Sequence, residues 1–205
     1  MKSSLLLLAF FFIQTSSNDF NNEEVNSCKT AEKIQYFNQV EKDILFFINL
    51  VRINPKKFNE TILKPYIVKY PEHSKKYSLS LINDLKKGKK LNPLKPTKDL
   101  FNFAKKHALT TGRKGKVGHR SARGKSFQKR TKELIKKYSL VGENIHYGSN
   151  NALEIVIDLL IDDGIKGVGH RVNILTQEYI YCSVSIQQHK KYKYNCVIDF
   201  AGKKI

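Results

Sequence analysis

The sequence contains no tryptophan, one methionine, three cysteines and five prolines among its 205 residues. The cysteines form neither a Cys-x-x-Cys pair nor a zinc-ribbon spacing, which excludes those redox and metal motifs. No low-complexity repeat is present. Beyond the first residues, no window approaches the run of about 18 apolar residues that indicates a transmembrane helix. These absences favour a globular chain without a membrane span.

The one strong apolar run lies at the N-terminus. Met1-Lys2-Ser3-Ser4 supplies a short positive region, Leu5 to Ile13 is apolar throughout, and small polar residues follow. This order is typical of a cleaved secretory signal, and we expect it to cover residues 1–17. An N-terminal membrane anchor is the alternative, but the apolar run is too short to span a bilayer. The prediction is a secreted, extracellular protein.

The remaining chain has a length that suits one domain with a substantial core. Residues 18–30 are polar and are expected to be loose. We therefore predict an N-terminal tail and the start of the first helix over residues 18–40, followed by a single domain over residues 41–201.

Apolar residues recur at helical spacing in several segments and alternate in the last one. The loop over residues 112–124 is rich in glycine, and Glu143 is expected at a turn or at the start of a strand. Two strands joined by a hairpin turn are predicted at the C-terminal end. This order predicts an α+β fold, with helices packed around a small antiparallel sheet. The predicted helices cover about residues 31–54, 79–87, 97–112, 127–138 and 152–161, and the strands cover residues 179–186 and 192–200.

Acidic residues are scarce compared with basic ones. Thirty-seven Lys and Arg stand against 18 Asp and Glu, which gives a formal net charge of +19. Such a charge attracts polyanions. Nucleic acid is the least accessible polyanion for a secreted protein, and no recognition helix, finger or basic motif interleaved with aromatics is present. We interpret the charge as a solvated surface that prefers anionic surfaces.

The cysteines would enter an oxidising compartment. Cys182 and Cys196 lie at equal distances from His189, near the middle of the predicted hairpin. If the turn lies there, the two thiols face each other, and we expect a disulfide between them. Cys28 then remains in the polar tail, either free or available to another chain.

Two tripeptides with the same sequence carry histidine. Gly118-His119-Arg120 precedes Glu143, and Gly169-His170-Arg171 follows the acidic pair Asp162 and Asp163. Two imidazoles with carboxylates can form a divalent-metal site or a general acid/base pair. They also occur as buried hydrogen-bond networks, so all three interpretations stay open. His107 differs, because it lies on the apolar face of a predicted helix and is expected to pack in the core.

Taken in order, five segments resemble the CAP superfamily, whose SCP-domain members include cysteine-rich secretory proteins, venom antigens and plant pathogenesis-related proteins. The resemblance runs from about residue 41 to residue 201 and is closest to the shorter bacterial-like and protist members. The segments are Ile48-Asn49-Leu50-Val51-Arg52-Ile53-Asn54-Pro55, Ala104-Lys105-Lys106-His107-Ala108, Gly118-His119, Gly142-Glu143-Asn144-Ile145 and Gly169-His170-Arg171-Val172-Asn173-Ile174-Leu175.

The resemblance implies an α-β-α sandwich with a central antiparallel sheet. It also implies a central cleft lined by a His-Glu-Glu-His tetrad, which binds a divalent metal such as zinc in some members. By position, His119, Glu143 and His170 match three of the four. Asp162 stands where the second glutamate is expected, with Asp163 beside it. Because aspartate is one methylene shorter, this departure alters the ligand set.

Two functions follow as hypotheses. The first is a secreted binding module whose histidine and acidic cleft and basic surface engage a lipid, a sterol, an anionic surface or a protein partner. The alternative is a metal-dependent hydrolase. In that case His119 and His170 would hold the metal, with Glu143 and Asp162 as cleft partners, and Glu143 would act as general base toward water. A third interpretation makes the same residues a structural hydrogen-bond network.

Overall fold

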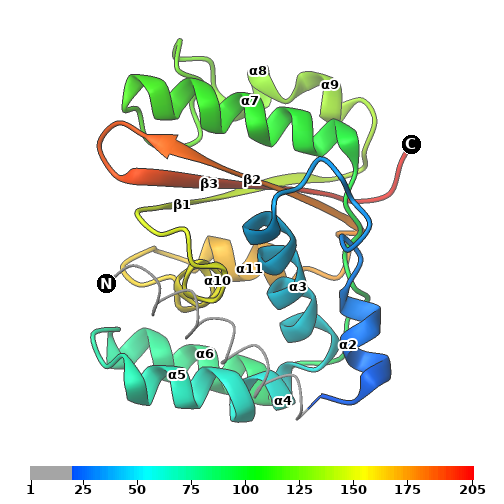
Figure 1. Ribbon diagram of the computed structural model, residues 1–205, viewed down its shortest axis with the longest axis vertical. Helices are drawn as coiled ribbons and strands as arrows, with labels where there is room; N and C mark the ends of the chain where they lie inside the picture. Colours follow the sequence, from blue (N-terminus) through cyan, green and yellow to red (C-terminus); the bar gives the residue numbers. More distant parts are fainter. Residues whose placement is uncertain (1–19) are drawn as a thin grey trace.

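The computed structural model of the protein describes residues 20–205, so the predicted signal peptide, residues 1–17, lies outside the described part. An antiparallel sheet is enclosed between helical layers (Figure 1). On one side lies α7 (Lys98–Lys114), and on the other lie α3 (Gln39–Ile53) and α10 (Ala152–Ile161). The predicted α-β-α sandwich is confirmed.

The sheet has three strands in the order β1-β3-β2. They are β1 (Val141–Tyr147), β2 (Tyr181–His189) and β3 (Lys193–Ala201), and both pairings are antiparallel. The predicted C-terminal hairpin is therefore confirmed as β2 and β3. Glu143 lies in the edge strand β1, directly opposite Asp199 of the central strand β3.

Strand β1 contacts both helical layers because successive side chains of a strand point to opposite faces. Ile145 packs with Ala104 and Ala108 of α7 on one side. Asn144 and His146 point to the other side, where His146 is bonded to Asp158 of α10 at 2.8 Å. Glu143 shares the face of Ile145 and so belongs to the α7 side.

The prediction of a loose segment over residues 18–30 is wrong for residues 20–30, the part of it that the structure describes. Helix α2 (Asn22–Cys28) begins with a capping box, in which the Asn21 side chain accepts from the backbone of Glu24 and the Glu24 carboxylate accepts from Asn21. Such boxes satisfy the free N–H groups that otherwise make a short helix unstable. Phe20 and Cys28 are buried in the main core, so the packed unit begins well before residue 41.

More of residues 55–93 is helical than predicted. Pro55 is the first residue of a helical segment, where a missing N–H costs no hydrogen bond. Pro65 instead lies within helical backbone that continues from residue 59 to residue 69 and includes a π-helical turn. The segments are α4 (Pro55–Phe58), the π-helical turn η1 (Asn59–Leu63), α5 (Lys64–Lys69) and α6 (Lys75–Lys87).

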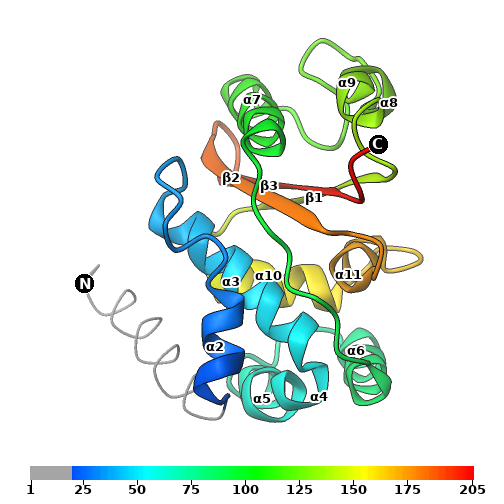
Figure 2. The ribbon, with the colours of Figure 1, turned by 90° about the vertical axis from the view of Figure 1, so that its right-hand side faces the viewer.

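The predicted helix over residues 127–138 is divided in two. Helices α8 (Phe127–Arg130) and α9 (Lys132–Ile135) are separated at Thr131, whose hydroxyl donates to the Phe127 carbonyl at 2.8 Å. Together with α7 they cover one face of the sheet (Figure 2). None of the helices within residues 20–205 is long and apolar enough to cross a membrane.

The predicted disulfide between Cys182 and Cys196 is wrong. The β2–β3 ladder pairs His189 with Lys193, so the turn lies further along the chain than the midpoint of the two cysteines. Cys182 therefore faces Phe200, and Cys196 faces Ile186. All three cysteines carry free thiols, and Cys28 is 1% exposed, which leaves it inaccessible to another chain.

The buried thiols should be unreactive in the native protein. Burial raises the pKa of Cys28 to about 12 and the pKa values of Cys182 and Cys196 well above their usual range. The thiolate is the nucleophile, so we expect almost no labelling by iodoacetamide near pH 8 without denaturant. In denaturant without reductant, all three thiols should react. A single reactive thiol under those conditions would show that a disulfide had formed.

Candidate functional site

His119 and Glu143 form the first histidine–carboxylate pair. The His119 Nδ1 and Glu143 Oε1 atoms lie 2.7 Å apart. Arg130, at the end of α8, donates to the other oxygen of Glu143 and also, through Nε, to the His119 carbonyl at 3.0 Å. The Glu143 side chain is 1% exposed and the His119 side chain 48%. The arginine thus closes a three-residue network with only the imidazole open to solvent.

The charge of Glu143 is stabilised in this network. Burial alone would raise the pKa of its carboxyl, but the hydrogen bond from His119 and the Arg130 guanidinium together hold the pKa below its usual range. Glu143 is therefore ionised at neutral pH. A carboxylate with a lowered pKa and both oxygens occupied is a poor proton acceptor.

Asp199 is a member of this site that the sequence analysis missed. It lies opposite Glu143 in β3, is fully buried, and neither of its carboxyl oxygens has a hydrogen-bond partner among the described residues. Burial, and next the negative charge of Glu143, raise the pKa of Asp199 well above its usual range. The fold therefore favours the protonated form of Asp199. The signal that could have revealed it is a single acid inside the apolar run Val197–Phe200.

His170 and Asp162 form the second pair. Asp162 ends α10 in the left-handed region at φ 57°. Its carboxylate accepts from the His170 backbone N–H at 2.8 Å and contacts His170 Nδ1 at 2.6 Å. The predicted aspartate therefore does meet the predicted histidine. The helix that follows, α11 (Gly169–Leu175), begins at this contact.

Arg171 anchors the second pair, although its side chain is almost entirely buried at 2% exposure. Its guanidinium donates to the carbonyls of Leu160 and Ile161 at 2.6 and 2.9 Å, which lie in the last turn of α10. It also donates to Asp84 and Ser80 of α6 at 2.8 and 2.9 Å. The arginine thereby holds together the helices that position His170 and Asp162.

The two Gly-His-Arg tripeptides therefore differ in structure. Arg120, the counterpart of Arg171, is exposed and makes a hydrogen bond only to the Gly124 carbonyl, at 3.3 Å, among the described residues. The first tripeptide is a solvent-facing loop, whereas the second starts a helix anchored in the core.

The two pairs belong to different layers. Glu143 points to the α7 side of the sheet, and its neighbour Asn144 points to the α10 side, where it donates to the His170 carbonyl at 2.9 Å. Asn173 of α11 donates in turn to Asn144 at 2.8 Å. His119 and Glu143 thus form one hydrogen-bonded pair, and Asp162 and His170 form another. Strand β1 contacts both pairs, the first through Glu143 and the second through Asn144.

A divalent metal such as zinc, which the family resemblance implied, does not fit this arrangement. Residues 20–205 contain no group of three or more His, Cys, Asp or Glu side chains placed to hold a metal ion. His119 and His170 each direct Nδ1 to a carboxylate, as metal-bound histidines also do, so the misfit lies in the lack of further ligands beside them. Asp163 turns away and accepts from the Ser74 backbone at 3.0 Å. No chemical step through a metal follows from this geometry.

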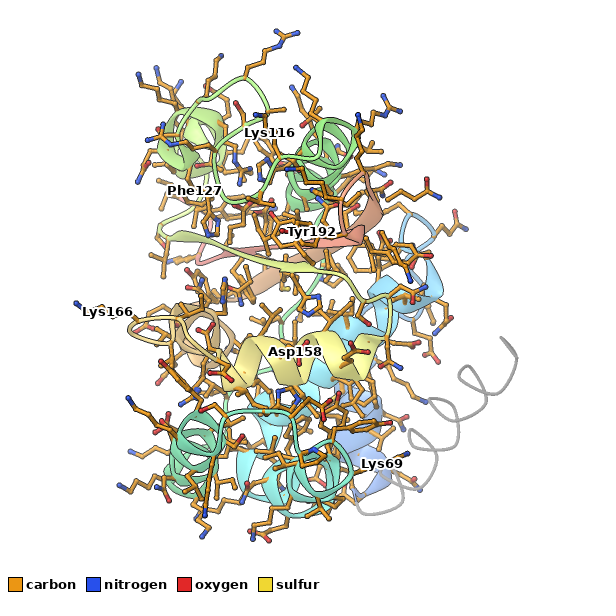
Figure 3. The ribbon with its side chains drawn as sticks, turned by 90° about the vertical axis from the view of Figure 1, so that its left-hand side faces the viewer. Lys69, Lys116, Phe127, Asp158, Lys166 and Tyr192 are labelled. Carbon is orange, nitrogen blue, oxygen red and sulfur yellow. The ribbon has the colours of Figure 1, made fainter. Side chains whose placement is uncertain are left out.

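The other histidines have structural roles. His107 is buried as predicted and contacts the Gly118 carbonyl at 3.1 Å, and burial lowers its pKa. His146 and His73 lie beside Asp158, with nitrogen–oxygen distances of 2.8 and 3.8 Å. Figure 3 shows Asp158 on α10, between the sheet and the α5–α6 layer. No pattern in the sequence indicated this cluster.

A comparison with protein families agrees with the motifs between residues 104 and 175. The family model described as the cysteine-rich secretory protein family, CAP, matches residues 79–200. The chain therefore belongs to the CAP family. No curated protein sequence matches it.

Two solved structures are similar to the chain. An extracellular SCP-domain protein of Bacillus anthracis str. Ames is 18% identical with a TM-score of 0.46, and the match covers 62% of this chain and 39% of that one. An outer surface protein of Borrelia burgdorferi has the same identity and TM-score, covering 56% of this chain and 80% of that one. The chain thus spans well under half of the Bacillus protein.

Removing the Asp162 carboxylate should destabilise the protein. Asp162→Ala leaves the His170 N–H and imidazole without their acceptor and puts alanine in a left-handed conformation. We expect a loss of about 2–4 kcal/mol in the free energy of unfolding. The adjacent Asp163→Ala, at an exposed position, should cost less than about 1 kcal/mol. Equal losses for the two variants, measured by urea denaturation, would contradict the assigned geometry.

Asp199→Asn should change how stability depends on pH. The folded-state pKa of Asp199 lies above the unfolded value, so its contribution to stability is fully present below about pH 4 and decreases as pH rises through the folded-state pKa. Asparagine cannot ionise, so the variant should gain stability relative to wild type as pH rises from about 4 to 8. Chemical denaturation across this range measures the difference. Parallel curves for wild type and the variant would show that the pKa of Asp199 is not raised in the folded protein.

Proposed function

We propose that the chain is an extracellular binding module that engages a lipid, a sterol, an anionic surface or a protein partner. Of these, an anionic surface is the partner that the charges support best. The proposal of an extracellular location derives from the signal-like residues 1–17 and from the absence of a membrane-spanning helix in residues 20–205.

One observation carries this proposal: the carboxylate of each histidine–carboxylate pair has both oxygens occupied. Glu143 is bonded to His119 and Arg130, and Asp162 is bonded to His170 at two atoms. The hydrolase hypothesis needs Glu143 free to accept a proton from water. The geometry therefore supports a framework role for these residues better than the alternative of metal-dependent hydrolysis.

The excess of Lys and Arg side chains supports an anionic surface as the partner. Thirty-seven Lys and Arg are present, and most of those in residues 20–205 make no ion pair with a carboxylate. Unneutralised surface cations attract anionic lipid headgroups, with about 1 kcal/mol per residue close to the surface. The attraction is screened by salt over a Debye length of about 8 Å at 0.15 M.

Vesicle co-sedimentation tests the proposed function. The chain should bind phosphatidylcholine vesicles that contain phosphatidylserine and not those of phosphatidylcholine alone. Binding should weaken steadily as salt rises from about 0.05 to 0.5 M, because counterions screen the charges. A parallel series with cholesterol tests the sterol. If neither phosphatidylserine nor cholesterol increases binding at moderate salt, the module does not engage lipid surfaces.

A further inference from the structure

A pocket of about 520 Å³ lies on the α7 side of the sheet, away from the His170–Asp162 pair. One wall is a single face of α7, which contributes Phe103, His107 and Thr110. The loop between α7 and α8 and the end of α8 form the opposite wall. The volume is in the range of small-molecule sites in proteins.

The pocket is lined by cations without any compensating acid. No aspartate or glutamate is among its lining residues. Within the described part of the chain, only Arg130 among its cations makes an ion pair, with Glu143. The six cations are Lys106, Lys114, Arg123, Lys125, Lys129 and Arg130.

This concentration of charge has a physical consequence. Like charges at close range repel, and a partly enclosed site weakens the screening that water supplies. A bound anion would remove that repulsion and satisfy the donors at once. Arg123 adds a planar guanidinium and Ser121 adds a hydroxyl whose proton is not used within the protein, and both suit phosphate oxygens.

We infer that this basic pocket binds a phosphoryl-bearing polyanion, either a soluble polyphosphate or the phosphomonoester headgroup of a lipid. This inference rests on the proposed function, because it names the anion and the place where it binds. A phosphomonoester carries nearly two charges at neutral pH, which matches several cations better than one carboxylate does. Most of the lining surface is apolar, because the aliphatic stems of the lysines and arginines add to Phe103 and Ala122, and the rest of the ligand can pack against it.

Arg130 connects the pocket with the first histidine pair. It lines the pocket while its guanidinium bonds Glu143 and the His119 carbonyl. The buried network thus fixes the end of α8, including the neighbouring Lys129. The histidine pair positions the wall of the pocket, and the anion binds to the exposed cations beyond it.

Isothermal titration calorimetry with sodium tripolyphosphate tests the inference on the full chain. Wild type should bind at about 0.15 M salt, and the variant Lys106→Gln/Lys114→Gln/Lys129→Gln should bind at least about tenfold more weakly, because each lost charged hydrogen bond weakens binding. These side chains belong to exposed residues, so the variant should keep its fold. The loop variant Arg123→Gln/Lys125→Gln provides a second measurement, independent of α7 and α8.

The matched control is Lys69→Gln/Lys86→Gln/Lys87→Gln, which removes the same charge from exposed positions on α5 and α6. Figure 3 shows Lys69 at the opposite end of the molecule from Lys116 and Phe127, which flank the pocket loop. The control should change the affinity by less than about threefold, since only long-range charge is lost. Equal weakening by control and pocket variants would overturn the inference.

The two possible sources of the phosphoryl group are separated with vesicles. Phosphatidylcholine vesicles containing phosphatidate should bind wild type and the control but not the pocket variants if a lipid headgroup is the ligand. Binding of tripolyphosphate without binding of vesicles supports the pocket with a soluble ligand, and counts against a surface-binding module. Vesicle binding that is equal in all variants supports the module, and it overturns the pocket if tripolyphosphate binding is also equal in all variants. Binding of neither probe overturns both.

Discussion

The buried guanidinium of Arg171 is the constraint on which the second half of the structure depends. It joins the last turn of α10 to α6 and fixes the start of α11, and with it the contact between Asp162 and His170. Only the partly exposed Asp84 offers it a carboxylate, so backbone carbonyls supply much of its compensation. Truncating such a group leaves several buried acceptors unpaired, at a cost of about 3–5 kcal/mol.

Arg52 has a comparable role at the other end of α11. Its guanidinium donates to the carbonyls of Asn92, Ile174 and Thr176, at 3.0, 2.8 and 2.8 Å, and burial lowers its pKa to about 10. It remains charged at neutral pH. Two buried arginines thus join segments that are distant in sequence, and both arginines belong to the motifs by which the chain resembles its family. These motifs therefore hold the fold together.

Edge strand β1 divides the site between two layers. Glu143 and Asn144 point to opposite faces, so the first histidine pair belongs to the α7 side and the second to the α10 side. On the α7 side, Asp199, whose pKa is raised, lies opposite the ionised Glu143 on the neighbouring strand. Arg130 connects this network to the basic pocket. Electrostatics therefore differ between the two sides. The α7 side has unneutralised cations, whereas the second pair is closed by its own contacts.

Local patterns in the sequence predicted the helix that ends at Asp162, the β2–β3 hairpin and the buried His107, because apolar periodicity and turn residues act over short distances. They also indicated the four site residues. The rest depends on contacts between distant segments. The register that separates Cys182 from Cys196 is set by packing against α7 and β1, and Asp199 becomes a site residue only through its partner across the sheet. A polar segment around Asn21 gave no sign that α2 packs in the core.

The central claim is that the basic pocket on the α7 side is the binding surface and that the second histidine pair belongs to the framework. Amide chemical shifts recorded by NMR during titration with tripolyphosphate test this claim most directly. We expect the largest changes in α7, in residues 118–126 and in α8, with the amides of Asp162 and His170 unaffected. Changes centred on residues 162–170 would contradict it.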